Sequence, residues 1–212
     1  MTGSQRLMIA TANAGKLREM RALLALPGLE LISLADLRIL QTVEEGSDYA
    51  ENARNKAATF ARITGNWTVA DDSGLEVDVL GGAPGPHSAR IAGEHASDAD
   101  RRALLLGLLQ SHPRPWTARF RCTMALASPE AAVDLAAGVC EGEVVPAEAG
   151  SGGFGYDPIF LVAGRGRTMA ELAEAEKNRL SHRARAVQAL LPTLYLRLGL
   201  GKPAPSSDSP AR

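Results

Sequence analysis

Apolar residues recur along the chain with two different spacings. Strict alternation, as in Phe120, Cys122, Met124 and Leu126, is typical of a strand, and apolar positions three and four residues apart are typical of a helix. These patterns predict strands at 7–10, 29–33, 68–70, 119–127 and 158–162, a strand pair around 133–145, and helices at 16–26, 48–63, 97–109, 170–176 and 181–198. Asp48 and Ser97, each with an acidic residue three positions later, are predicted to cap the helices that they begin. The mixture of strands, hairpins and helices predicts an α/β fold with a mixed sheet.

Composition then limits the class of protein. The 212 residues are 45% apolar but only 4% aromatic, which predicts an aliphatic, alanine-rich core. The formal net charge of −1 argues against a protein that binds a nucleic-acid backbone. No stretch approaches the ~20 apolar residues of a membrane span and no signal peptide is visible, so we expect a cytoplasmic protein. We expect a single domain over residues 1–200 and a disordered tail, rich in Pro and Ser, over 201–212.

Basic residues and thiols add two smaller expectations. Of the 23 basic residues, only Lys16, Lys56, Lys177 and Lys202 are lysines. A chain that otherwise uses arginine is expected to keep lysine where a compact ammonium fits better than a wide guanidinium. The two cysteines lie in apolar, strand-like segments and are predicted to be buried thiols.

The first candidate site is the turn between the first strand and the first helix, Thr11-Ala12-Asn13-Ala14-Gly15-Lys16. A helix start has unpaired N–H groups and a positive dipole end, and both favour a phosphate. Gly15 permits close approach of the backbone, and Lys16 adds a positive charge. The segment lacks the G-x-x-x-x-G-K-[ST] pattern of a P-loop. It therefore fits both a phosphate-binding loop and an ordinary helix cap.

Two acidic pairs form the second candidate. Glu44 and Glu45 lie in a polar loop, whereas Asp71 and Asp72 follow the strand at 68–70, before a Ser-Gly pair predicted to end that strand sharply. Neighbouring strand residues point to opposite faces, so one aspartate at most is expected to face a given site. One carboxylate from each pair, with phosphate oxygens and waters, would hold Mg²⁺. The alternatives are a solvated loop for the glutamates and turn capping for the aspartates.

The third candidate is the glycine-rich segment 150–158, which contains Phe154, Gly155, Tyr156 and Asp157. It matches G-x-G-x-x-G literally, but Tyr-Asp-Pro follows where a dinucleotide-binding motif needs a helix. A flexible loop that presents its two aromatic rings to the flat face of a base fits better. The alternative is a hairpin loop whose rings fill the core.

The fourth candidate is the segment that contains Lys177, Ser181, His182 and Arg183. Ser181 is a predicted N-cap, which places His182 and Arg183 in the first turn of a helix. Cations there oppose the helix dipole. An anion or a carbonyl oxygen is therefore their expected partner, and a structural histidine is the alternative.

Seven segments of the chain, taken together in their order and spacing, resemble those of one known protein family. They are residues 11–16 with Glu19, 51–53 with Lys56, 70–75, 80–85, 88–90, 152–160, and 176–178 with 181–183. In this order they resemble the inosine triphosphate pyrophosphatase family, also called the Ham1 family, over residues 6–198. The resemblance implies an elongated mixed sheet flanked by helices, in two lobes with an active-site cleft between them. It also implies a homodimer that uses Mg²⁺ to hydrolyse dITP, ITP and XTP to the monophosphate and pyrophosphate.

The resemblance also implies roles for individual residues. Asp72 would ligate Mg²⁺ and act as the general base, and Glu44, or the adjacent Glu45, would be the second metal ligand. Residues 11–16 and Lys56 would bind the triphosphate, and Ser73 would contact the substrate. The base and sugar would be held by Phe154, Gly155, Tyr156, Asp157, Lys177, His182 and Arg183.

Three other functions stay open at this stage. A Maf-like pyrophosphatase would use similar chemistry on modified pyrimidine nucleotides. A regulatory module would bind a nucleotide without turnover, although binding alone needs no positioned base. An RNA-binding protein would use the aromatic loop at 150–158, but the net charge of −1 argues against it.

Overall fold

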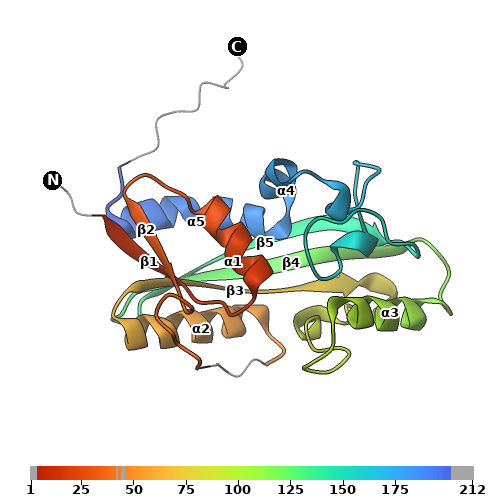
Figure 1. The fold of residues 1–212 in the computed structure, drawn as a ribbon, viewed down its shortest axis with the longest axis horizontal. Helices are drawn as coiled ribbons and strands as arrows, with labels where there is room; N and C mark the ends of the chain where they lie inside the picture. Colours follow the sequence, from red (N-terminus) through yellow and green to blue (C-terminus); the bar gives the residue numbers. More distant parts are fainter. Residues whose placement is uncertain (1–3, 42, 44–45, 202–212) are drawn as a thin grey trace, which may run out of the picture.

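A six-stranded mixed sheet forms the centre of the molecule, in the computed structural model that describes residues 4–41, 43 and 46–201 (Figure 1). The strand order is β2-β1-β3-β4-β5-β6. In this order, β2, β1 and β3 pair in parallel, and the β3–β4, β4–β5 and β5–β6 pairs are antiparallel. The predicted mixed α/β fold is therefore confirmed. The strands are β1 Gln5–Ile9, β2 Leu29–Ser33, β3 Trp67–Val77, β4 Trp116–Ala127, β5 Val133–Val144 and β6 Phe160–Val162.

Helix starts follow the predicted capping residues. The helices are α1 Ala14–Leu23, α2 Tyr49–Thr64, α3 Asp98–Leu109, α4 Glu174–Leu180 and α5 His182–Leu198. Asp48 caps α2 by accepting a hydrogen bond from the Glu51 N–H at 2.7 Å. Ser97 forms a capping box with Asp100 at the start of α3, and Ser181 caps α5.

Four predicted elements were wrong in extent or kind. β3 does not end at the Asp-Ser-Gly segment but runs eleven residues, to Val77. Gly74 is needed for close packing, not for a turn, because a Cβ there would lie 2.0 Å from the Gly85 carbonyl oxygen. The predicted helix at 170–176 is a 3-10 turn, Met169–Glu171, followed by α4, since Leu172 is extended. Residues 133–145 form one strand rather than a pair, and Pro158 lies in a 3-10 turn before β6.

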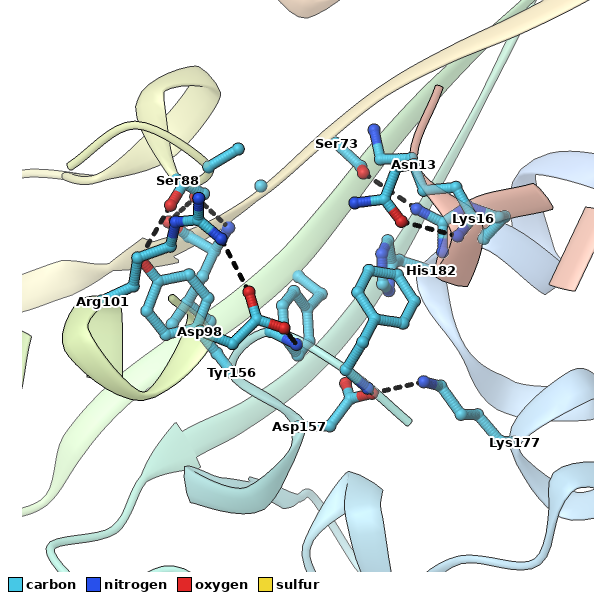
Figure 2. Close-up of a pocket in the computed structure, with 17 residues that line it drawn as sticks. Asn13, Lys16, Ser73, Ser88, Asp98, Arg101, Tyr156, Asp157, Lys177 and His182 are labelled. Carbon is cyan, nitrogen blue, oxygen red and sulfur yellow. Dashed lines mark hydrogen bonds and ion pairs between the residues drawn. The ribbon is translucent and has the colours of Figure 1, made fainter. Parts of the chain in front are cut away.

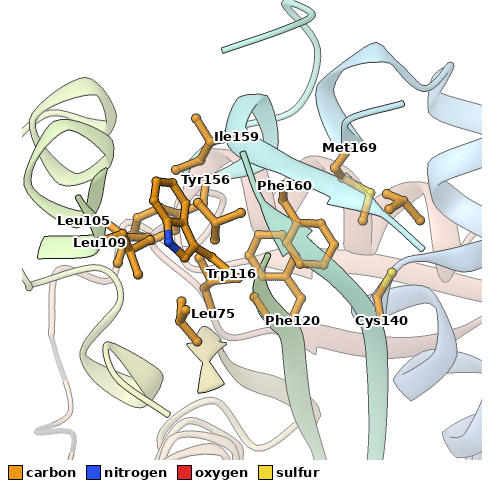
Figure 3. Close-up of a cluster of buried hydrophobic side chains, with 14 of the residues drawn as sticks. Leu75, Leu105, Leu109, Trp116, Phe120, Cys140, Tyr156, Ile159, Phe160 and Met169 are labelled. Carbon is orange, nitrogen blue, oxygen red and sulfur yellow. The ribbon is translucent and has the colours of Figure 1, made fainter. Parts of the chain in front are cut away.

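Three buried clusters hold helices against the sheet. The cluster under α2 is alanine-rich, as predicted, and includes Ala53, Ala57, Ala70 and Ala125. α5 covers the opposite face of the same strands (Figure 1). A third cluster lies at the α3 end of the sheet and contains four of the five buried aromatic residues in the described part of the chain, with Trp116, Phe120 and Phe160 at its centre (Figure 3). Both cysteines are buried and reduced, as predicted.

Two expectations concern the chain as a whole. No helix in the described ranges is long and apolar enough to cross a membrane. Residues 202–212 of the predicted tail lie outside the described residues, and the division at residue 200 stays a prediction.

Candidate functional site

A cavity opens on the α5 face of the sheet, between the α1 start and the α3 start (Figure 2). The space between its walls, which includes open solvent, is ≈ 580 Å³, and its polar and aromatic lining suits a small-molecule ligand. Its walls come from residues far apart in the sequence: Asn13, Lys16, Ser73, Gly74, Leu75, Ser88, Ala89, Asp98, Arg101, Phe120, Phe154, Gly155, Tyr156, Asp157, Lys177, His182 and Arg183.

The cavity brings together ten of the predicted site residues. These are Asn13, Lys16, Ser73, Phe154, Gly155, Tyr156, Asp157, Lys177, His182 and Arg183. The remaining predicted residues in the described part do not line the cavity: Thr11, Ala12, Ala14, Gly15, Lys56 and Asp72. Glu44 and Glu45 lie outside the described residues.

The turn after β1 forms a capped helix start. Asn13 is the N-cap of α1, and its side chain accepts a hydrogen bond from the Lys16 N–H at 3.0 Å. The helix begins at Ala14, two residues earlier than predicted, so residues 14–16 form its first turn. A Cβ on Gly15 would lie 2.5 Å from the Phe154 ring. The glycine therefore makes room for that ring, a contact the sequence could not show.

Asp71 and Asp72 point to opposite faces of β3, as predicted. Asp71 lies on the α5 face, 3.0 Å from the Arg183 Nη2 atom and 3.3 Å from the Lys16 ammonium. Asp72 lies on the α2 face, where the Asn52 Nδ2 atom donates to it at 2.8 Å and the Lys56 ammonium is 3.7 Å away. Among the described residues, no group of three or more His, Cys, Asp or Glu is placed to hold a metal.

On its β1 side, β3 has no ladder pairing between Val69 and Glu76 among the described residues. β1 pairs with β3 only over Trp67–Val69, because the chain then leaves the sheet for the α1 start. The next backbone pairing on that edge is the isolated antiparallel bridge between Glu76 and Pro84. The edge at residues 71–73 thus lies beside the α1 start, with Asp72 on one face and Ser73 on the other.

A chain of six charges, five of them buried, runs along the wall of the cavity. Its acids and bases alternate, in the order Asp157, Lys177, Glu19, Arg183, Asp71 and Lys16. The Lys177 ammonium lies 2.5 Å from Asp157 and 2.7 Å from Glu19. Each charge has an opposite neighbour, which offsets the large penalty for burying ions. The chain fixes side chains from α1, β3, α4 and α5 relative to one another.

Burial and these neighbours set the charge states. Burial alone would raise the pKa of Asp71, but Lys16, Arg183 and Lys56 outweigh it and hold that pKa well below its ordinary value. His182 behaves differently, because burial and the cations Arg183 and Lys177 all lower its pKa. Its imidazole stacks on Phe120, with ring centroids 4.7 Å apart and planes at 15°. The cavity therefore presents a neutral histidine at neutral pH.

The lowered pKa of His182 predicts a loss of stability in acid. Below pH ~6.5 the unfolded chain binds a proton at this residue that the folded chain excludes. This histidine should contribute up to about 1.4 kcal/mol of lost stability per pH unit. Urea unfolding between pH 7 and 5 should show a shallower pH dependence for His182→Gln than for the wild type. His95→Gln, an exposed control, should follow the wild type; parallel curves for all three proteins would contradict the prediction.

The two rings of the glycine-rich loop have different environments. The Phe154 ring lines the cavity and packs on Gly15, with the Lys177 ammonium 5.1 Å and the Arg183 guanidinium 5.7 Å from its centroid. Tyr156 is buried in the aromatic cluster and donates its hydroxyl to the Ser88 carbonyl at 2.8 Å. The structure thus places Phe154 at the cavity, whereas Tyr156 fills the core and also contributes to the cavity wall.

Sequence reasoning gave no role to several residues that shape the site. Asn52 and Glu19 are among the residues that resemble the family, but no role was predicted for either. Both are buried and contact site residues. Phe120 appeared only as part of an alternating strand. Asp98 and Arg101 line the cavity from the first turn of α3, which the sequence marked as nothing more than a capped helix.

The known proteins that this chain is similar to match it over the whole of the candidate site. The family model described as Ham1 family matches residues 7–193, which include every residue that lines the cavity. A Geobacillus kaustophilus protein named dITP/XTP pyrophosphatase is 49% identical over 188 residues, 88% of this chain and 92% of that protein. One from Geobacter sulfurreducens with the same name is 49% identical, over 87% of this chain and 94% of that protein. The solved structure of a HAM1 protein from Coxiella burnetii has a TM-score of 0.82 and 38% identity, covering 91% of this chain and 99% of that one.

Proposed function

This chain belongs to the Ham1 family, and from that premise we propose that it hydrolyses dITP, ITP and XTP to the monophosphate and pyrophosphate. The observation that carries the proposal is the contact of the Phe154 ring with Gly15. It joins a helix start suited to phosphates and an aromatic wall suited to a base in one cavity. The names of the relatives support the same substrates.

The triphosphate is proposed to lie at the α1 start. The first-turn N–H groups and the helix dipole favour an anion there. Lys16 and Lys56 stand on either side of the open β3 edge, each beside an aspartate. Their compact ammonium groups can neutralise phosphate oxygens that approach this edge. Lys16, Lys56 and Lys177 all lie in or beside the site, which agrees with the argument from lysine scarcity.

The base is proposed to stack on Phe154 and to be read by donors around it. Hypoxanthine and xanthine carry a 6-oxo group that accepts hydrogen bonds, whereas adenine carries an amino group there. Arg183 and a neutral His182 can donate to the oxo group. With adenine these buried donors would be left unpaired, which reduces binding strongly.

The attacking water is proposed to be activated at Asp72. Its carboxylate is held by Asn52 and lies beside the Lys56 ammonium, so it is oriented before substrate binds. Asp72 can accept a proton from a water in line with the α-phosphorus. The same arrangement positions the water on the side of β3 opposite the base.

Asp72 also suits a divalent metal, which we propose to be Mg²⁺. Mg²⁺ uses one or two carboxylates together with substrate phosphate oxygens, so a site with one described carboxylate at an open edge fits it. When bound, Mg²⁺ supplies positive charge to the phosphate oxygens. Asn52 exchanges two hydrogen bonds with Gly46, at 2.7 and 3.1 Å, and so ties the residue after Glu45 to Asp72. This tether supports Glu44, or the adjacent Glu45, as the second carboxylate.

The homodimer and the cytoplasmic location stay predictions.

A substrate panel tests this function. With Mg²⁺ present, dITP and XTP should be cleaved to monophosphate and pyrophosphate, with kcat/KM at least about a hundredfold above that for dATP. Products are separated by ion-exchange chromatography. Release of orthophosphate would contradict the proposal, a preference for pyrimidine triphosphates would favour a Maf-like enzyme, and binding without turnover would favour a regulatory module.

A further inference from the structure

We propose that the first turn of α3 is a clamp that positions Phe154 for the base, by holding both polar groups of Gly155. The Gly155 N–H donates to the Asp98 Oδ2 atom at 2.7 Å. The Gly155 carbonyl accepts a hydrogen bond from the Arg102 Nη1 atom at 2.8 Å. One turn of a helix thus fixes a glycine more than fifty residues away. The inference rests on the proposed stacking of the base on Phe154.

Both clamp residues are themselves held in place. The second Asp98 oxygen accepts a hydrogen bond from Arg101 at 2.7 Å (Figure 2). Arg102 makes a bidentate pair with Glu148, at 2.8 and 3.1 Å, which leaves its remaining nitrogen for the Gly155 carbonyl. Charged groups with fixed partners make the stronger kind of hydrogen bond. The clamp is therefore formed before any ligand arrives.

The loop needs such an anchor because of its composition. Gly153 and Gly155 have positive φ values of 71° and 62°, and an unanchored glycine-rich loop has many other conformations to choose from. Phe154 lies between these two glycines, so the direction of its ring follows from theirs. Anchoring Gly155 removes alternatives that substrate binding would otherwise have to suppress.

Asp98 has an alternative role that the test must separate from the clamp. As the first residue of α3, an aspartate also stabilises the helix through its dipole. That role depends on charge alone and is shared with Asp100 in the same turn. The clamp depends on a side-chain oxygen at position 98 that accepts a hydrogen bond from the Gly155 N–H, and an asparagine also has such an oxygen.

The experiment measures KM for dITP in Asp98→Ala, Asp98→Asn and Arg102→Met. We expect Asp98→Ala and Arg102→Met to raise KM about fivefold to twentyfold with kcat within about twofold, as for a loss of uniform binding. Asp98→Asn keeps an acceptor for the Gly155 N–H but turns its amide NH2 toward Arg101, so it should raise KM less than Asp98→Ala does. The inhibition constant of inorganic tripolyphosphate, which has no base, should not change in any of these variants.

Matched controls exclude a general loss of structure. Asp100→Ala weakens the cap of the same helix without touching Gly155, and Arg197→Met removes a bidentate pair with Asp134 of the same geometry elsewhere. Both should keep the KM of the wild type. An equal rise of KM in Asp100→Ala, or an equal rise of the tripolyphosphate constant in Asp98→Ala, would overturn the clamp.

A Phe154→Ala variant separates the clamp from the proposed function. Phe154→Ala should raise KM for dITP, and adding Asp98→Ala to it should change KM less than about twofold, because the two act through one ring. If Phe154→Ala alone leaves KM unchanged, the base does not stack on Phe154, and the proposal that the clamp positions this ring for the base is also wrong. If Phe154→Ala raises KM but Asp98→Ala does not, the clamp alone is wrong.

Discussion

Replacing Asp72 with asparagine should lower kcat for dITP about a thousandfold, within the range for loss of a general base. The substitution keeps the shape of the side chain, and its oxygen can still accept the hydrogen bond from Asn52. The protein should therefore remain folded and bind nucleotide. The rate is measured as pyrophosphate release, and binding is measured by calorimetry with dITP.

Asp134→Asn is the matched control for Asp72→Asn. Asp134 is also on a strand of the sheet, β5, and is paired with a cation, Arg197, but it does not line the cavity. It should keep the kcat of the wild type. If Asp72→Asn retains more than a tenth of the wild-type kcat, Asp72 is not the base, and the assignment of the reaction to the α2 face of β3 fails.

Replacing Glu19 with glutamine should destabilise the fold by about 3–5 kcal/mol, because it leaves Lys177 and Arg183 buried without their shared counter-ion. For a chain of this length, that loss lowers Tm by roughly 6–20 °C. The attraction of these two cations also outweighs burial and holds the pKa of Glu19 below its ordinary value, so the carboxylate is charged at neutral pH. Thermal unfolding followed by circular dichroism measures the shift.

Two further variants make the Glu19 result specific. Glu30→Gln breaks an exposed pair with Arg6 and should leave Tm nearly unchanged, since exposed pairs contribute little. Adding Lys177→Met to Glu19→Gln also removes the counter-ion of buried Asp157, so the double variant should be less stable than Glu19→Gln. A Tm of Glu19→Gln within 2 °C of the wild type, which corresponds to about 1 kcal/mol, would show that the buried charges are not a stabilising chain.

Local signals in the sequence predicted much of the framework. The caps at Asp48, Ser97 and Ser181 fall where the spacing of Ser, Asp and Glu places them, because capping uses only neighbouring residues. The alternation of side chains along a strand placed Asp71 and Asp72 on opposite faces. The joint order of the motifs identified the family, which the comparisons confirm.

Local signals failed where a distant segment decides the conformation. The Asp-Ser-Gly segment resembles a turn, but β4 pairs with it over its whole length and keeps it extended. Gly15 and Gly74 resemble flexible points, yet each is small because another segment, Phe154 or Gly85, packs against it. The reason for such a glycine lies in its neighbour in space, about which the surrounding sequence carries no information.

The sequence by itself determined the elements, their caps and the residue types of the site. The tertiary structure alone decided how those residues act together: that Asp71 joins a chain of buried charges, that Asp72 faces Lys56, and that the start of α3 holds Gly155. The physical reason is that these contacts join residues 16 to 164 positions apart. Each contact depends on the packing of a whole sheet, whereas a cap or a strand alternation depends only on a few consecutive residues.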